Sequence, residues 1–263
     1  MKRLVILGGG TAGTIMANKL RPRLDEDEWQ MTLVDENSIH YYQPGFLFIP
    51  FGIYTKREVV KPRRRFIPRG VQFILSPVEE IKAQENKVVL GSGEVLPYDV
   101  LIIATGSQIH PEETEGMLEA GWHENIFDFY TLEGALALHQ RLQRWEGGRL
   151  VIHINEMPIK CPVAPLEFAF LVDWWLGERG LRKKTELFYV TPLDGAFTKP
   201  VASRLLGDTL AQRGIQLIPE FNVARVDGEK NKLISWDDRE VEYDLLVTIP
   251  TNMGAEVIAR SGL

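Results

Sequence analysis

A short glycine-rich segment near the N-terminus constrains the fold more than any other part of this sequence. Residues 8–13, Gly-Gly-Gly-Thr-Ala-Gly, fit the pattern G-x-G-x-x-G and stand between an apolar run, residues 4–7, and a helix predicted over residues 11–20. In such a unit the glycines allow a tight turn, a close approach of the backbone to a pyrophosphate, and close packing of helix on strand. The helix N-terminus adds unpaired N–H groups and a partial positive charge. The predicted contacts of a dinucleotide are Gly8, Gly10, Thr11, Ala12 and Gly13.

An acidic residue follows at the distance expected for a dinucleotide-binding fold. The strand predicted over residues 31–34 ends at Asp35, whose carboxylate is suited to accept a hydrogen bond from a ribose hydroxyl. The alternative is a glycine-rich turn that binds nothing. Because a buried strand precedes the loop and a helix follows it, dinucleotide binding is the favoured interpretation.

A second motif favours FAD over NAD as the cofactor of this first unit. Residues 98–106, Tyr-Asp-Val-Leu-Ile-Ile-Ala-Thr-Gly, form an apolar strand that ends in Ala-Thr-Gly. This segment resembles the second fingerprint of the two-dinucleotide-domain flavoproteins, in which the strand end lies near the FAD. The resemblance implies FAD as cofactor. The further predicted cofactor contacts are Glu36, Gln43, Val78, Ala104, Thr105 and Gly106.

The order of strand and helix signals predicts the fold class. Strands and helices alternate through the first third of the chain, and the pattern restarts after Ser107. Two successive β-α-β blocks predict an α/β protein with two doubly wound, Rossmann-like domains of the FAD/NAD(P)-binding type. We expect the FAD-binding domain to span residues 1–110 and 243–263. The second domain, which resembles an NAD(P)-binding domain, is expected over residues 111–242.

The loop of the second unit does not fit a nucleotide site. The strand predicted over residues 149–154 continues into residues 155–162, which contain no glycine. Pro158 and Pro162 remove backbone donors that a phosphate would need, and Glu156 would repel a phosphate. We therefore expect no NAD(P)H at the usual place in this domain, so that the electrons come from another donor.

The same loop carries a narrower resemblance. Residues 161–167, Cys-Pro-Val-Ala-Pro-Leu-Glu, residues 189–192, Tyr-Val-Thr-Pro, and residues 40–45, His-Tyr-Tyr-Gln-Pro-Gly, are similar to segments of the sulfide:quinone oxidoreductase family. That family oxidises sulfide at a redox cysteine pair beside FAD and passes the electrons to quinone at the membrane. The resemblance implies an FAD-dependent oxidoreductase with a small sulfur compound as substrate and quinone as acceptor. It also implies that Cys161 is one of the two redox cysteines.

The surroundings of Cys161 are compatible with a reactive thiol, and a small buried packing residue is the alternative. The cysteine follows Lys160 and stands just before a helix predicted over residues 165–180. A helix N-terminus and a neighbouring cation both favour the thiolate, which is the form that attacks sulfur. Glu167, in the first turn of that helix, is a candidate for proton transfer, and helix capping is its alternative role.

Departures from that family keep two other functions open. Cys161 is the only cysteine, and the family's C-terminal Gly-Asp motif, which holds the flavin ribityl chain, is absent, as are its C-terminal helices. These departures predict a truncated chain. The alternatives are a flavoprotein reductase that uses NAD(P)H and a nucleotide-binding scaffold without catalysis.

Composition and charge limit the classes of partner that this chain is expected to bind. The net charge is −6, and the longest basic run, residues 61–65, has no interleaved aromatic residue, so we expect no nucleic-acid binding and a solvated basic face. The single cysteine cannot form an internal disulfide, which suits a reducing compartment. No stretch reaches the roughly 18 to 20 apolar residues that span a bilayer. We expect a cytoplasmic protein, or one bound peripherally to the cytoplasmic face of the membrane, without a metal site.

The helix predicted over residues 165–180 is apolar almost all round. Such a helix is usually buried in a core, and this is the favoured interpretation. Trp174 and Trp175 cannot both face the same way, so a homodimer contact or a membrane-surface contact is the alternative for one of them.

Overall fold

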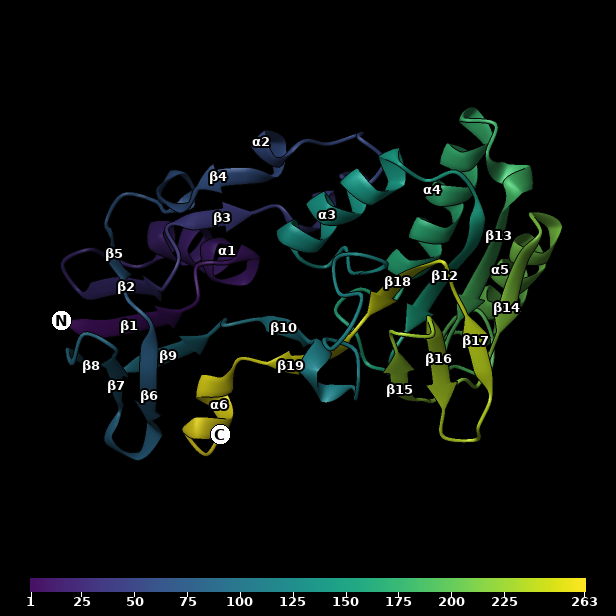
Figure 1. Cartoon of the computed structure of the whole chain (residues 1–263). Coiled ribbons are helices and arrows are strands. Elements are labelled where there is room, and N and C mark those ends of the chain that lie inside the picture. Colours follow the sequence, from purple (N-terminus) through teal and green to yellow (C-terminus); the bar gives the residue numbers. More distant parts are fainter. The chain divides into compact units, whose positions relative to one another are not determined.

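The computed structural model describes residues 1–263, and the chain divides into two compact units (Figure 1). Unit 1 comprises residues 1–42, 60–108 and 253–263, and unit 2 comprises residues 43–59 and 109–252. The domain boundaries expected from the sequence differ from this division, because they assign residues 43–59 to the first domain and return to it at residue 243.

A four-stranded parallel sheet of order β5-β2-β1-β9 forms the centre of unit 1. Its strands are β1 (Lys2–Leu7), β2 (Trp29–Asp35), β5 (Val71–Leu75) and β9 (Val100–Ile103). In β1, Leu4 and Ile6 join the apolar cluster that contains Ala17 of helix α1 (Thr11–Leu20), whereas Val5 and Leu7 join a cluster on the other face. Cover on both faces explains why the strand is continuously apolar.

The smaller elements of unit 1 complete its two faces. The antiparallel strands β6 (Val78–Lys82), β7 (Lys87–Leu90) and β8 (Val95–Pro97) pack on the face of Val5 and Leu7. Helix α6 (Glu256–Arg260) contacts β6. The strands β3 (Ile39–Tyr41) and β4 (Val60–Pro62) pair antiparallel, and the 3-10 helix η3 (Arg63–Phe66) follows β4 directly.

Unit 2 contains a five-stranded parallel sheet of order β11-β18-β12-β13-β14. Its strands are β11 (Ile126–Phe127), β12 (Gly148–Ile154), β13 (Thr185–Val190), β14 (Ile215–Ile218) and β18 (Leu245–Ile249). Its helices are α2 (Lys56–Val59), α3 (Leu132–Gln143), α4 (Ala164–Glu178) and α5 (Pro200–Gln212), with the 3-10 helix η2 (Gln43–Phe48). The antiparallel strands β15 (Val223–Asp227), β16 (Lys232–Ser235) and β17 (Glu240–Glu242) share an apolar cluster with Phe188 and Val190 of β13.

Helix α4 lies mostly in the core of unit 2, where it contacts β12 and β13 (Figure 1). Trp175 is buried, and the ring of Phe168 lies 5.1 Å from that of Phe51 and 4.9 Å from that of Phe129. Trp174 is the exception, with 48% of its surface exposed. Core packing therefore explains the apolar character of this helix, except at Trp174.

The fold class predicted from the sequence is confirmed, since both units contain a parallel sheet of the doubly wound type. The predicted bounds of helix 11–20 agree with the structure. The β3–β4 pair and helix α6 were not predicted, because elements of 3 to 5 residues show no measurable periodicity. None of the helices is long and apolar enough to cross a membrane.

Candidate functional site

The glycines of the 8–13 loop meet different spatial requirements. Gly8 has a φ of +92°, and a Cβ there would collide with the carbonyl group of Ala104. A Cβ on Gly13 would collide with the carbonyl oxygen of Gly8, so helix α1 can lie this close to the loop only with glycine at that position. At Gly10 nothing lies within 4 Å of the Cβ position. The loop therefore leaves open space beside Gly10, where a ligand can approach the backbone.

The N-terminus of helix α1 is open as well. Gly10 is the N-cap residue, and no side chain caps the helix. The hydroxyl of Thr14 donates back to the carbonyl of Gly10 at 2.7 Å, while Thr11 and Ala12 are exposed. The N–H groups of a first helical turn lack partners within the helix and carry partial positive charge. The residues present therefore fit a pyrophosphate group.

Asp35, at the end of β2, contacts this loop directly. Its Oδ2 accepts a hydrogen bond from the backbone N–H of Gly9 at 2.6 Å, and its Oδ1 accepts one from Asn37 at 2.7 Å. The guanidinium of Arg63 lies 3.2 Å from Oδ1. Because an ionised carboxylate offers about four acceptor sites in all, Oδ2 retains the capacity to accept from a ribose hydroxyl.

Arg63 corrects an expectation from the sequence. The run 61–65 was expected to be a solvated face, yet Arg63 is only 5% exposed, while Arg64 and Arg65 are exposed. Burial lowers the pKa of the Arg63 guanidinium, and the neighbouring Asp35 carboxylate counteracts this effect. Sequence reasoning missed Arg63 because nothing in a short basic run distinguishes the one member that folds inward.

The end of β9 lies against the glycine loop, as the resemblance to the second fingerprint implies. The backbone N–H of Ala104 donates to the carbonyl of Leu7 at 2.7 Å, and the Cα of Thr105 is 3.0 Å from the Cβ position of Gly8. Gly106 follows with a φ of +73°. The carboxyl ends of β1 and β9 therefore converge at one edge of the sheet, where open α/β sheets bind their ligands.

The remaining predicted cofactor contacts, Glu36, Val78 and Gln43, lie in different parts of the fold. Glu36 is exposed and follows Asp35 directly. The N–H of Ser76 donates to the carbonyl of Asp35 at 3.0 Å, so Val78, two residues later, is close to the same strand end. Gln43 begins η2 in unit 2, and its contact with a cofactor stays a prediction.

In unit 2, the loop after β12 makes internal hydrogen bonds. The side-chain oxygen of Asn155 accepts from the hydroxyl of Thr114 at 3.0 Å, and its amide nitrogen donates to the hydroxyl of Thr251 at 3.0 Å. Asn155 is 9% exposed. The side chain at the end of this strand is therefore committed to the protein itself.

Cys161 is partly exposed and lies three residues before helix α4. Its carbonyl oxygen accepts from the N–H of Ala164 at 3.2 Å and from the hydroxyl of Tyr130 at 2.8 Å. The N–H of Lys160 donates to Asn252 at 3.1 Å. Lys160 keeps exposed surface, although the surrounding protein lowers the pKa of its ammonium, an effect that Asp128 opposes.

A tyrosine that sequence reasoning missed joins the neighbourhood of Cys161. Burial raises the pKa of Tyr130, and the charges of the nearby Cys161, Tyr189 and Glu167 raise it further, whereas the hydrogen bond to the Cys161 backbone lowers it. Glu167 is exposed in the first turn of α4, whereas Tyr189 is fully buried and its hydroxyl has no hydrogen-bond partner. The structure therefore brings both predicted catalytic candidates of unit 2 into one region.

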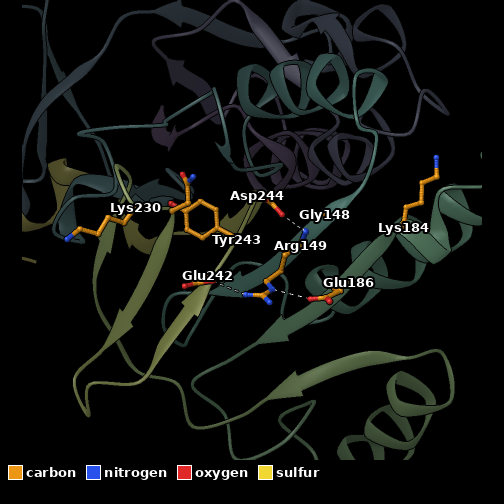
Figure 2. Close-up of a pocket in the computed structure, with 9 residues that line it drawn as sticks. Gly148, Arg149, Lys184, Glu186, Lys230, Glu242, Tyr243 and Asp244 are labelled. Atoms are coloured by element: carbon orange, nitrogen blue, oxygen red, sulfur yellow. Dashed lines mark hydrogen bonds and ion pairs between the residues drawn. The ribbon is translucent and has the colours of Figure 1, made fainter.

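A charged cleft of about 520 Å³ lies elsewhere in unit 2 (Figure 2). Arg149 forms ion pairs there with Glu186 at 3.2 Å and Glu242 at 3.4 Å, and its N–H donates to Asp244 at 2.7 Å. The cleft lies at the beginnings of β12 and β13, whereas ligands of open α/β sheets bind at the carboxyl ends. Because its central cation is paired internally, this cleft is not favoured as the functional site.

The sequence of this chain is similar to that of known proteins. Residues 2–153 match the model of the pyridine nucleotide-disulphide oxidoreductase family. A mitochondrial sulfide:quinone oxidoreductase from Dictyostelium discoideum is 24% identical over 265 residues, which cover 99% of this chain and 58% of that protein. A sulfide-quinone reductase from Aquifex aeolicus is 27% identical and is covered to 61%, against 99% of this chain.

The solved structures agree with these relatives. The crystal structure of the sulfide:quinone oxidoreductase from Aquifex aeolicus has a TM-score of 0.84 to this chain at 27% identity, covering 98% of this chain and 61% of that one. The chain thus spans about three-fifths of the length of the relatives that it matches.

Proposed function

Because this chain belongs to the pyridine nucleotide-disulphide oxidoreductase family, whose members are FAD-binding flavoproteins, we propose that unit 1 binds FAD and serves in flavin-dependent oxidation of a sulfur compound. One observation carries the cofactor assignment: the open space at Gly10 lies at the uncapped N-terminus of α1, with the Asp35 carboxylate on the same loop.

Different residues of unit 1 would bind different parts of FAD. The backbone N–H groups of the first turn of α1 would hold the pyrophosphate, and Asp35 would accept from the adenosine ribose. Glu36 and Val78 flank the strand ends on the adenosine side, and the Ala104–Gly106 segment lies against the loop. When bound, FAD supplies a two-electron acceptor.

The substrate proposed is hydrogen sulfide or a related small sulfur compound. The Cys161 thiolate and a hydrosulfide ion would form a sulfur–sulfur bond and give a persulfide anion on Cys161, with the loss of one proton and of two electrons, which bound FAD would accept. The support is the names of the relatives, the partial exposure of Cys161, and its position just before helix α4. Glu167 is the proposed proton acceptor.

Quinone is the proposed electron acceptor, which would take up two electrons and two protons. Because quinones reside in membranes, the proposal includes peripheral contact with a membrane, at its cytoplasmic face. The half-exposed Trp174 is the proposed contact residue on unit 2, either for that surface or for a second copy of the chain in a homodimer.

An NAD(P)H-dependent flavoprotein reductase is the second candidate, which the family name favours. The loop 155–162 argues against it, since it has no glycine and the Asn155 side chain is bonded internally. Rapid reduction of bound flavin by NADH without oxygen would favour this candidate, particularly if Glu156→Gln changed the rate.

The test starts with the visible spectrum of the purified chain after incubation with FAD and gel filtration. Flavin bands are expected, and a colourless protein would refute the cofactor assignment. Sulfide is then added without oxygen and without quinone to the unaltered chain and to Cys161→Ser, and decylubiquinone is added afterwards as the acceptor. Bleaching of the flavin in the unaltered chain alone supports the sulfur chemistry, whereas equal bleaching in both would remove Cys161 from it.

A further inference from the structure

Arg63 makes an unusual set of contacts for a residue from a basic run. Its Nε donates to the carbonyl of Asn37 at 2.7 Å and its Nη2 donates to the carbonyl of Ile39 at 2.5 Å. Nη2 also lies 3.2 Å from Oδ1 of Asp35. One guanidinium group thus binds the strand end that carries Asp35 and the segment that follows it.

The same side chain occupies the space beside the second glycine of the loop. A Cβ at Gly9 would lie 2.8 Å from Cδ of Arg63 and 3.1 Å from its Nη1. This nitrogen is buried and has no hydrogen-bond partner. The Cδ2 atom of Leu33 lies 2.9 Å from the same Cβ position. The G-x-G-x-x-G pattern does not require glycine at position 9, so the side chains of Arg63 and Leu33 together explain the glycine found there.

The negative charge of Asp35 lies beside the glycine loop, and the positive charge of Arg63 compensates it. Oδ2 of Asp35 lies 2.6 Å from the N–H of Gly9, so a negative charge already lies against the loop that must accept two phosphate groups. A phosphate held by this loop would be repelled by the Asp35 carboxylate, and partly buried surroundings strengthen such repulsion. His40 faces the same carboxylate, but burial lowers its pKa and favours the neutral form. Arg63 is the cation that faces Asp35.

We propose that Arg63 is a positioning residue for the dinucleotide: it neutralises Asp35 beneath the loop and holds its carboxylate against Gly9, so that the loop accepts a doubly charged pyrophosphate. This inference rests on the proposed binding of FAD by unit 1. A purely structural brace for residues 37–39 would stabilise the fold and leave the charge of Asp35 irrelevant to FAD affinity.

A double-mutant cycle separates these two roles. The apo forms of the unaltered chain, Arg63→Met, Asp35→Asn and the double variant are titrated with FAD by flavin fluorescence, and their thermal midpoints are measured without FAD. Arg63→Met leaves the Asp35 charge uncompensated, and its FAD affinity is expected to fall about 10- to 100-fold. In the double variant that charge is gone, so the affinity is expected to be no weaker than in Arg63→Met alone. Arg64→Met, next in the chain and exposed, is the control and should stay within about twofold.

Several outcomes would overturn the inference. Losses that multiply in the double variant, or an Arg63→Met affinity equal to that of the unaltered chain, leave Arg63 without this role. Arg63→Lys covers the case in which Arg63→Met does not fold, because it retains the charge and loses the fork of donors. We expect it to lose thermal stability but less than tenfold in FAD affinity, and a loss as large as about 100-fold would contradict charge compensation. An unaltered chain that does not bind FAD would overturn both this inference and the cofactor assignment.

Discussion

The phenol of Tyr130 donates a hydrogen bond to the backbone carbonyl of Cys161 across 2.8 Å, and it thereby ties the segment before helix α3 to the loop before helix α4. Cys161 belongs to a segment with few regular hydrogen bonds of its own, so this contact from a partly buried tyrosine restrains the backbone at Cys161.

Replacing Tyr130 with phenylalanine tests that restriction. The loss of one hydrogen bond should cost about 1 kcal/mol of stability, because the Cys161 carbonyl keeps its bond from Ala164. We expect iodoacetamide to alkylate Cys161 several-fold faster at pH 7, since the loop opens more often. Tyr42→Phe, at a tyrosine that is 52% exposed, is the control. An unchanged labelling rate would show that the tyrosine does not restrain the thiol.

Two glycine substitutions should separate folding from cofactor binding. Gly10→Val places its side chain in open space, so we expect a thermal midpoint close to that of the unaltered chain and a loss of FAD binding. Gly13→Val drives its Cβ into the carbonyl of Gly8, so the protein itself should be destabilised by several kcal/mol, as expected for overpacking and backbone displacement. Flavin content and thermal melting are measured on both. Full flavin content in Gly10→Val would exclude the loop as the pyrophosphate site.

Labelling of Cys161 in the native protein distinguishes a reactive thiol from a packing residue. Because the side chain is partly exposed, we expect iodoacetamide to react with it in the native protein, without denaturant. It is the only cysteine in the chain, so mass spectrometry of the intact protein gives its modification directly, with Cys161→Ser as the unlabelled control. A thiol that reacts only in denaturant would be structural.

His153 should make the fold sensitive to acid. It is fully buried in β12, its Nδ1 lies 3.0 Å from the Thr248 hydroxyl, and burial lowers its pKa to about 3. Below the ordinary pKa of 6.5, His153 binds a proton in the unfolded chain but stays neutral in the native chain. The free energy of unfolding therefore falls as the pH drops from 6.5 towards 3. The contribution of His153 to the change in the free energy of unfolding approaches roughly 1.4 kcal/mol per pH unit.

Urea unfolding at pH 7, 6 and 5 measures this effect. His153→Gln should remove the contribution of this residue, and its stability should vary less over the same range. His139→Gln, at a partly exposed histidine, is the control and should retain the pH dependence of the unaltered chain. If the stability of His153→Gln and of the unaltered chain fell equally with pH, His153 would not be the cause of the acid sensitivity.

Much of the local structure was predictable because its causes lie close together in the sequence. The run 4–7, the glycines at 8 and 13 and the helix to residue 20 form one continuous segment, and each glycine meets an atom of the same segment or of the strand end at 104. Asp35 follows from the length of a β-α-β unit. The parallel strands were visible as continuous apolar runs because both of their faces are covered.

The glycine loop, the two parallel sheets and the lack of a glycine loop after β12 could all be inferred from local sequence patterns. The burial of Arg63 but not of Arg64, and the contact of Tyr130 with Cys161, become visible only in the folded chain. The Nε and Nη2 atoms of Arg63 contact oxygens 24 to 28 residues away, and the Tyr130 bond spans 31 residues. Periodicity and turn chemistry report the conformation of neighbouring residues, whereas the burial of a polar group depends on partners that only the folded chain brings within hydrogen-bonding distance.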